Sequence, residues 1–163
     1  MFRDPALKES QMPNLTDNES ADAIRAHHAE LQAVLRERVV ALTDAVRSGQ
    51  TPQPTQRAVL AYLDNELLPH AAAEERTIYC AGDRGVTAML VQAMLAEHRN
   101  LIAHVAGLRE SADAIEAVGS AMAIQALFES HLSKENDLLL PALMADPSVS
   151  LGELLGGMHE ILG

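Results

Sequence analysis

The chain has 163 residues, a length that suits a single domain with a buried core of its own. Its formal net charge is −11, and a chain this acidic repels nucleic acid and anionic lipid, so neither is expected as a partner. The single cysteine, Cys80, excludes an internal disulfide. Aromatic residues make up only 2% of the chain, which favours closely packed helices over a broad sheet.

The N-terminal segment predicts neither export nor membrane insertion. Residues 1–15 mix charged residues, polar residues and two prolines without a period, so we interpret them as a mobile tail and not as a signal peptide. No uninterrupted apolar run reaches the roughly 18 residues that a membrane-spanning helix needs. We therefore expect a cytoplasmic protein.

The first predicted helix covers residues 16–48. Thr16 followed by Glu19 matches a capping box, in which each side chain bonds the backbone N–H of the other residue. One face at spacings of three and four carries Ile24, His28, Leu31, Leu35, Val39, Leu42 and Val46. Gly49 is expected to end this helix, and the two prolines that follow predict a short connection.

The second predicted helix begins with Thr55 as its cap and places Val59, Tyr62, Leu63 and Leu67 inward. Pro69 lies within this pattern, removes one backbone hydrogen bond and predicts a kink just before His70. The glycines at positions 82 and 85 are expected to close the segment.

Two more long helices are predicted, over residues 87–109 and 113–140, and Pro141 is expected to terminate the second of them. Their inward faces carry Leu90, Met94, His98, Leu101, Val105 and Leu108, then Ile124, Leu127, Phe128, His131, Leu138 and Leu139. Four methionines at helical positions are interpreted as core residues: Met89, Met94, Met122 and Met158.

The pattern as a whole predicts an all-α fold. We expect an up-down-up-down four-helix bundle over residues 16–145, preceded by the mobile tail. A short amphipathic helix, capped by Ser148 or Ser150, is expected within residues 146–163.

Histidines and glutamates recur in the same order in both halves of the chain. His28 opens the first half within His-x-x-Leu, and His98 opens the second half within the same pattern. One helix later, each half has a His-x-x-x-Glu pair, a spacing that puts both side chains on one helical face: His70 with Glu74, and His131 with Glu135. Six such groups on apolar faces would be unfavourable to bury, and metal ligation satisfies all of them, with iron, manganese or zinc as suitable ions.

These six residues, within a stretch of about residues 20–145, resemble the hemerythrin-like HHE cation-binding family. The resemblance implies a four-helix bundle with a non-haem di-iron centre, bridged by an oxo or hydroxo group. Carried over position by position, it implies one iron on His28 and His70, the other on His98 and His131, and bridging by Glu74 and Glu135.

The chain departs from the oxygen-carrying branch of that family. Those carriers have a second histidine four residues after the third-helix histidine, where this chain has Ile102, and an aspartate five residues after the fourth-helix histidine, where it has Asn136. The pattern is more similar to the branch linked to nitric oxide, peroxide and iron–sulfur repair. Two histidines per iron and two bridging glutamates leave a position open for a small ligand. The Glu-x-x-His pairs of ferritin-like proteins are absent from the sequence.

Residues around this set have alternative roles. Glu66 lies one turn before His70, and Glu97 directly precedes His98; each lies either on a solvated face or beside a ligating histidine, where it would be a catalytic proton relay. His27 is the alternative to His28 as a ligand, and Tyr62 is interpreted as a core residue with ligation left open. Tyr79 and Cys80 are interpreted as packing residues, and His104 and His159 as histidines outside the site.

The leading functional interpretation is a non-haem protein with two iron ions that reacts with peroxide, nitric oxide or oxygen in oxidative or nitrosative stress. If it turns over, it is an oxidoreductase of a peroxidase-like, catalase-like or nitric-oxide-reactive kind. The alternative is a non-catalytic sensing, carrying or storage protein for oxygen, nitric oxide or iron. A plain helical interaction module predicts no bound metal. The expected partner is a small diatomic or peroxide ligand; the sequence leaves open a homodimer and manganese in place of iron.

Overall fold

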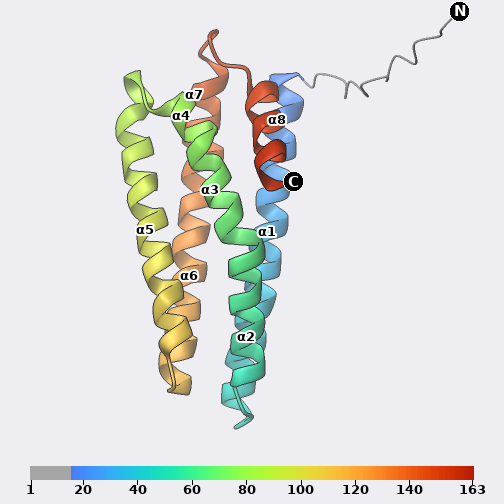
Figure 1. Ribbon diagram of the computed structural model, residues 1–163, viewed down its shortest axis with the longest axis vertical. Coiled ribbons are helices and arrows are strands. Elements are labelled where there is room, and N and C mark those ends of the chain that lie inside the picture. Colours follow the sequence, from blue (N-terminus) through green and yellow to red (C-terminus); the bar gives the residue numbers. More distant parts are fainter. Residues whose placement is uncertain (1–15) are drawn as a thin grey trace, which may run out of the picture.

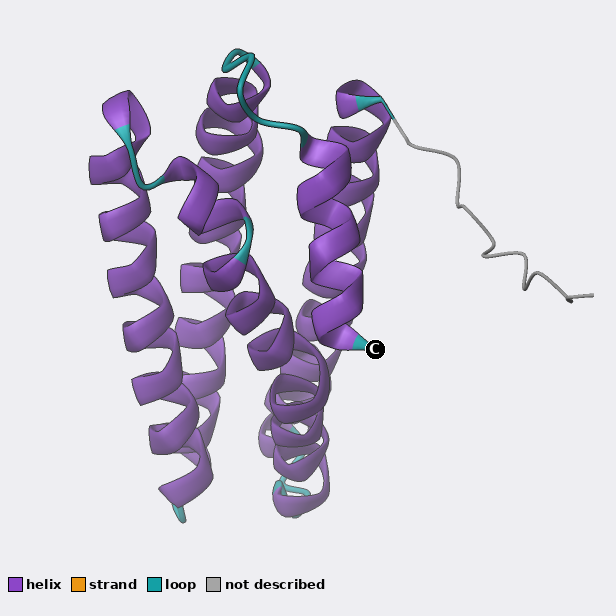
Figure 2. Ribbon diagram, turned by 45° about the horizontal axis from the view of Figure 1, so that its top comes forward, coloured by secondary structure: helices purple, strands orange, loops and turns teal. Residues whose placement is uncertain are grey.

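Residues 16–163 form helices joined by short turns, with no strand in that range, in the computed structural model (Figure 1 and Figure 2). Four helical rods lie side by side along the long axis, and successive rods run in opposite directions (Figure 1). They are α1 (Asp17–Arg47); α2 (Gln53–Tyr62) with the π-helical turn η1 (Leu63–Leu67) and α3 (Leu68–Arg76); α5 (Ala88–Glu110); and α6 (Ala114–Lys134) with the π-helical turn η3 (Glu135–Leu139) and α7 (Leu140–Met144). The expected mobile tail, residues 1–15, lies outside the described residues.

The capping box at the start of α1 is confirmed. The Glu19 carboxylate accepts the Thr16 backbone N–H at 2.8 Å, and the Thr16 hydroxyl accepts the Glu19 N–H at 3.3 Å. Two residues beyond the end of α1, Gly49 has a φ of +67°, a backbone conformation that glycine adopts without steric strain. The helix therefore begins and ends where the sequence predicts.

The prediction of Thr55 as the cap of the second helix is wrong. The helix begins at Gln53, and Pro54 lies in its first turn. Backbone N–H groups of a first turn have no partner within the helix, so a proline there costs no hydrogen bond. Thr55 lies inside that turn, and its hydroxyl donates to the Pro52 carbonyl at 2.8 Å.

Both inner prolines follow a π-helical turn. The turn η1 precedes Leu68-Pro69, and η3 precedes Leu140-Pro141. In each turn a backbone N–H bonds five residues back, from Leu68 to Leu63 and from Leu140 to Glu135. The wider turn relieves the clash between a proline ring and the preceding turn, so the helix continues beyond the proline. The prediction that Pro141 terminates the fourth helix is therefore wrong, because α7 runs on to Met144.

The remaining elements lie at one end of the bundle and along its side: α4 (Ile78–Gly82), the 3-10 turn η2 (Gly85–Thr87) and α8 (Leu151–Leu162). Ser150, one of the two expected caps, begins α8, since its hydroxyl accepts the Glu153 N–H at 3.4 Å. The Asp17 carboxylate accepts the Leu151 N–H at 2.8 Å and so ties α8 to the start of α1. Among residues 16–163, no helix combines the length and the apolar character needed to cross a membrane.

The core consists of two hydrophobic clusters with a polar layer between them. One cluster includes Leu35, Leu63, Leu108 and Ile124, and the other includes Ile24, Met94, Leu139 and Met158. Three residues predicted for the core are exposed instead: Met89 (82%), Met122 (55%) and Leu138 (54%). Leu138 lies within η3, where the π turn shifts the residues that face inward.

Candidate metal centre

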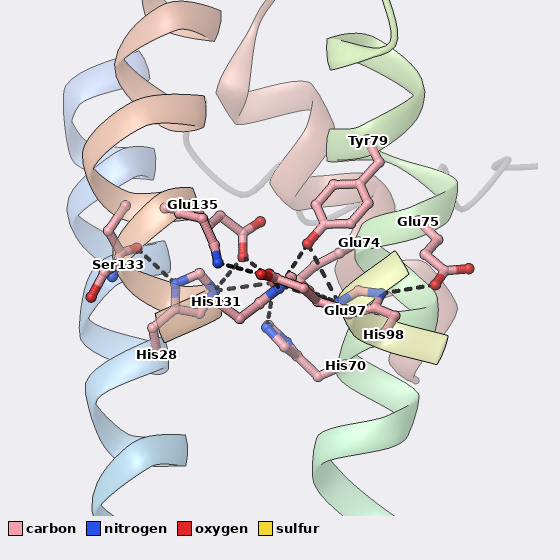
Figure 3. A network of polar contacts seen from close by, with 12 residues as sticks. His28, His70, Glu74, Glu75, Tyr79, Glu97, His98, His131, Ser133 and Glu135 are labelled. Carbon is pink, nitrogen blue, oxygen red and sulfur yellow. Dashed lines mark hydrogen bonds and ion pairs between the residues drawn. The ribbon is translucent and has the colours of Figure 1, made fainter. Parts of the chain in front are cut away.

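The polar layer contains the four histidines and two glutamates that the sequence singles out (Figure 3). Each of the four rods contributes one histidine, and Glu74 on α3 and Glu135 at the start of η3 add the carboxylates. All six side chains are buried, with exposures of 4% or less: His28, His70, Glu74, His98, His131 and Glu135. The repeat in the sequence thus brings its members to one level of the bundle.

Glu74 lies between two pairs of histidines. Its Oε1 is 3.2 Å from Nε2 of His28 and 2.7 Å from Nε2 of His70, and its Oε2 is 3.8 Å from Nε2 of His98. Two groups of three side chains therefore share this carboxylate, each with its nitrogen and oxygen atoms within 4.8 Å of one another: His28, His70 and Glu74; then Glu74, His98 and His131.

Glu135 lies on the same level without a hydrogen-bond partner. Both of its carboxylate oxygens are buried, and neither is bonded by any described residue. Its Oε2 is 3.9 Å from Nε2 of His28 and 3.9 Å from Nε2 of His131, which belong to different groups. A buried carboxylate without a partner is unfavourable, and a cation between these side chains would satisfy it.

Three of the four histidines are fixed from outside through Nδ1. His28 bonds the Asn136 amide oxygen at 2.8 Å, and His98 and His131 bond carboxylates at 2.8 and 3.0 Å, those of Glu75 and Glu97. A carboxylate or amide oxygen only accepts, so Nδ1 carries the proton and Nε2 turns a lone pair towards the cluster. Outer acceptors of this kind are typical of metal-ligating histidines.

The two buried glutamates have opposite protonation tendencies. Burial raises the pKa of Glu74, but the imidazoles of His70 and His28 outweigh burial and hold this pKa well below its ordinary value. Burial and the neighbouring Glu74 carboxylate raise the pKa of Glu135 well above its ordinary value. Burial also lowers the pKa of His131. A bound cation would favour neutral imidazoles and two ionised carboxylates.

The donor set fits a metal site. Nε2 of His70 lies 2.7 Å from Glu74 Oε1 without the geometry of a hydrogen bond, and Nε2 of His98 lies 3.1 Å from Nε2 of His131. The lone pairs of these buried nitrogen and oxygen atoms point towards one another, and Glu135 beside them has no partner. This arrangement is unfavourable unless a cation lies between the atoms. Imidazole nitrogens with carboxylate oxygens suit iron, manganese or zinc.

A family model of the hemerythrin HHE cation-binding domain matches residues 19–143. The chain belongs to the hemerythrin HHE family. The match includes all six cluster residues and does not include α8. No match is found among curated proteins or among solved structures.

The two positions at which this hemerythrin HHE domain differs from the oxygen carriers have distinct surroundings. Ile102, one turn after His98, is 54% exposed and lines a surface pocket together with His98 and Glu75. Asn136 remains beside the cluster, where its amide oxygen accepts the Nδ1 proton of His28.

The structure separates the two glutamates that the sequence suggests as catalytic. Glu97 contacts His131, and its other carboxylate oxygen accepts a short hydrogen bond from Nζ of Lys134. Glu66 is exposed, and no hydrogen bond between described residues joins it to the cluster. Glu75, which the sequence interpretation did not select, makes the corresponding contact with His98.

His27 and Tyr62 lie outside the groups of convergent donors. His27 is exposed on α1, and its ring packs edge-on against His70 with the centroids 4.9 Å apart. Partial loss of solvent around its ring, and then the neighbouring His70 and His28 imidazoles, lower its pKa. Tyr62 donates its hydroxyl to the Leu31 carbonyl at 2.9 Å, and burial raises the pKa of Tyr62 to about 12.

Tyr79 is the cluster neighbour that the sequence interpretation missed. Its hydroxyl lies 2.8 Å from Nε2 of His131 and 3.4 Å from Nε2 of His98, and its ring stacks on His98 (Figure 3). Burial, and then the nearby carboxylates, raise the pKa of Tyr79 far above its ordinary value. A break at Thr77 (φ −123°, ψ −83°) between α3 and α4 turns Tyr79 inward, so helical spacing does not predict it. Cys80, predicted to pack, is exposed.

Proposed function

We propose that the cluster binds two iron ions and that the loaded protein reacts with peroxide, nitric oxide or oxygen in defence against oxidative or nitrosative stress. The observation that carries this proposal is the position of Glu74, whose two oxygens face different pairs of histidines. One ion would be held by His28 and His70, the other by His98 and His131. Glu74 would bridge the two ions.

Glu135 supports a paired site rather than a single ion. Its Oε2 is equally far, 3.9 Å, from a histidine of each group, and it has no other partner among the described residues. A second bridging carboxylate would also help to balance the charge of two cations. Bound iron would supply the redox change and an open position for a small ligand.

Tyr79 places a hydroxyl group at the edge of this site. Its hydroxyl is within hydrogen-bonding distance of the inner nitrogens of His98 and His131. Without bound metal, burial and the nearby carboxylates raise the pKa of this phenol. With those nitrogens engaged by a cation, the hydroxyl would be free to donate to a molecule bound beside them.

Glu97 links the site to the surface. It accepts from Nδ1 of His131 and from Nζ of Lys134, whose side chain is 28% exposed. This contact would hold the His131 ring in place and offers a route for protons between solvent and the site. The proposal therefore assigns the relay role to Glu97, because Glu66 has no such contact.

The alternative is a non-catalytic sensing, carrying or storage role. The observation that favours it is the burial of all six donor side chains. Burial slows the entry of small molecules to the site, and it also slows the escape of a molecule that has bound there. Turnover separates the two functions. An enzyme consumes many equivalents of peroxide or nitric oxide per chain, and a binder stops near one.

The test is an assay of protein purified from iron-replete cells, with its iron content measured on the same sample. With a chemical reductant supplied in excess, sustained peroxide or nitric oxide consumption is expected from the wild type and is expected to disappear in Glu74→Ala, which removes the shared carboxylate. Activity that persists in an iron-free Glu74→Ala preparation would show that the chemistry does not arise at this centre. Saturation after one equivalent would favour the binding role.

A further inference from the structure

A cavity of about 290 Å³ lies between α1, α3 and α8. Buried side chains form its floor, namely Ile24, His70 and Met158. Exposed side chains form its rim, namely His27, His159 and Leu162. Apart from its three imidazoles the lining is apolar, and no acidic, lysine or arginine side chain among the described residues takes part in it.

His70 on the floor of this cavity is the one cluster histidine without an outer partner. Nδ1 of each of the other three meets an oxygen acceptor from Asn136, Glu75 or Glu97. Nδ1 of His70 is buried and makes no hydrogen bond with any described residue. The neighbouring His27 ring packs against His70 and does not supply that bond. A buried N–H without an acceptor is unfavourable, so this position calls for one.

The wall that α8 provides is firmly attached. Ser150 caps the helix, Asp17 bonds its first N–H, and Leu151 and Met158 are buried in the adjoining hydrophobic cluster. A Cβ at Gly157 would lie 3.4 Å from the Thr77 side chain, so the helix approaches α3 and α4 closely. Because α8 lies outside residues 19–143, one wall of the cavity comes from outside the matched domain.

We propose that this cavity binds a small monocarboxylate with a short apolar body, whose carboxylate accepts a hydrogen bond from Nδ1 of His70. The apolar lining suits the body of such a ligand, and the polar side chains of the lining, available to its head, are imidazoles that can donate hydrogen bonds. The volume is about ten times the ~30 Å³ that a water molecule occupies in the liquid. The ligand would complete for His70 the contact that Glu75 and Glu97 provide for His98 and His131.

This inference rests on the proposed function at one point. With Nε2 of His70 on a cation, Nδ1 carries the proton and the positive centre behind the ring favours an anionic acceptor. Binding of the carboxylate and of the metal therefore support each other, and the effect of each on the other is reciprocal. The carboxylate should bind more tightly to the metal-loaded chain, and it should slow the loss of metal.

Titration calorimetry of the iron-loaded full-length chain with hexanoate tests the site, with hexanol and acetate as matched probes. We expect one hexanoate per chain, bound about tenfold more tightly than hexanol, which lacks the head, and than acetate, which lacks the body. Equal affinity for hexanol, or no saturable binding of hexanoate, would overturn the proposal. The metal-free chain should bind hexanoate more weakly, and equal affinity would show that the head does not contact His70.

Two neighbouring leucines on α8 supply a variant and its control. Both are half-buried, but Leu155 lines the cavity and Leu154 does not. Leu155→Trp should weaken hexanoate binding about tenfold or more, and Leu154→Trp should leave it within about twofold, with thermal melting confirming that both fold. Wild-type affinity in Leu155→Trp would place the ligand elsewhere.

Iron release to a chelator gives a second readout on the same proteins. Hexanoate should slow release in the wild type and in Leu154→Trp, and it should have no effect in Leu155→Trp. Counting iron in each sample distinguishes a failure of the proposed iron centre from a failure of the proposed carboxylate site. Protein without iron would overturn the proposed function, whereas iron-loaded protein that ignores hexanoate would overturn this inference alone.

Discussion

Glu135 is the carboxyl group of the metal-free cluster that no described side chain bonds. It is fully buried, both its oxygens lack partners, and its pKa is raised well above the ordinary value of 4.5 by burial and by Glu74. A carboxyl group with a raised folded-state pKa contributes stability below its unfolded-state pKa and loses that contribution as the pH rises through the folded-state pKa. In the metal-free protein, this residue therefore opposes folding at neutral pH.

Glu135→Gln should accordingly raise the free energy of unfolding of the metal-free protein at neutral pH. The gain should shrink as the pH falls through 4.5, because below that value Glu135 is protonated in both the folded and the unfolded state. Urea unfolding of both proteins across this pH range measures it. A Glu135→Gln variant that is less stable than the wild type at neutral pH would contradict the raised pKa assigned to Glu135. The same substitution should lower metal content.

Two substitutions distinguish which of the neighbouring histidines of α1, His27 or His28, binds the metal. His28 is buried against Glu74, whereas His27 is exposed and packs on the outside of His70. His28→Ala should lose most of the bound metal, and His27→Ala should keep nearly all of it. Metal counts on the two purified variants decide the matter, and the opposite order would move the ligand to His27.

At the residue scale, the sequence was sufficient where a helical period links the residues. The four histidines and two glutamates were found in this way, and the structure brings them together. Tyr79 and Glu75 were missed because their contacts depend on the break at Thr77 and on the approach of α3 to α5, which no local spacing encodes. Glu66 was selected by spacing, yet it faces solvent, because η1 lies between Tyr62 and Leu68 and alters that spacing.

At the scale of elements, the two π-helical turns are the feature that the sequence hides. Helices and apolar faces follow from local patterns: α1 begins at its predicted cap, and Ser150, one of the two expected caps, begins α8, whereas the cap expected at Thr55 is wrong. Pro141 is expected to end its helix, but η3 accommodates the proline and the helix continues, as it also does beyond η1 at Pro69. The outcome depends on packing on both sides of the turn, because Leu63, Leu67 and His70 must all face inward.

Deleting Asn65, an exposed residue of η1, tests this role. The deletion should convert the π turn to an α turn and rotate α3 by about 100° relative to α2. Either His70 and Glu74 then leave the cluster or Val59 and Tyr62 leave the core, so most of the metal should be lost and the melting temperature should fall. Asn65→Ala, which keeps the length, should change stability by no more than about 0.5 kcal/mol. A deletion variant with wild-type metal content would refute the role of the turn.

At the scale of the whole molecule, the polar layer divides the core into two hydrophobic clusters that belong to one bundle. Bound metal would join all four rods at this level, so its removal should weaken the fold without abolishing it. Metal in hundredfold excess over its dissociation constant stabilises a protein by about 2.7 kcal/mol. Treatment with a chelator should therefore lower the melting temperature by about 5–10 °C. Identical melting of the two forms would show that the centre is not coupled to the bundle.

Acid should release the metal. Binding requires neutral imidazoles and ionised carboxylates, so protons compete at all six side chains as the pH falls. Histidine ordinarily titrates near 6.5, and burial lowers the pKa of His131, which delays protonation there. Glu135, with its raised pKa, takes up a proton earlier and promotes release. We expect the protein to lose its metal below about pH 6.5. Dialysis at a series of pH values and metal analysis of the retained protein measure this loss. Full metal retention well below that range would contradict proton competition.

The central claim is that Glu74 bridges two metal ions inside the bundle, and counting iron tests it most directly. Wild-type protein and Glu74→Ala should be purified side by side from iron-replete cells, checked for equal helical content, and analysed for iron per chain. The wild type should contain two iron ions per chain, and Glu74→Ala should retain less than half of that amount. Equal iron in the two proteins, or a wild type without bound metal, would contradict the assignment of this cluster.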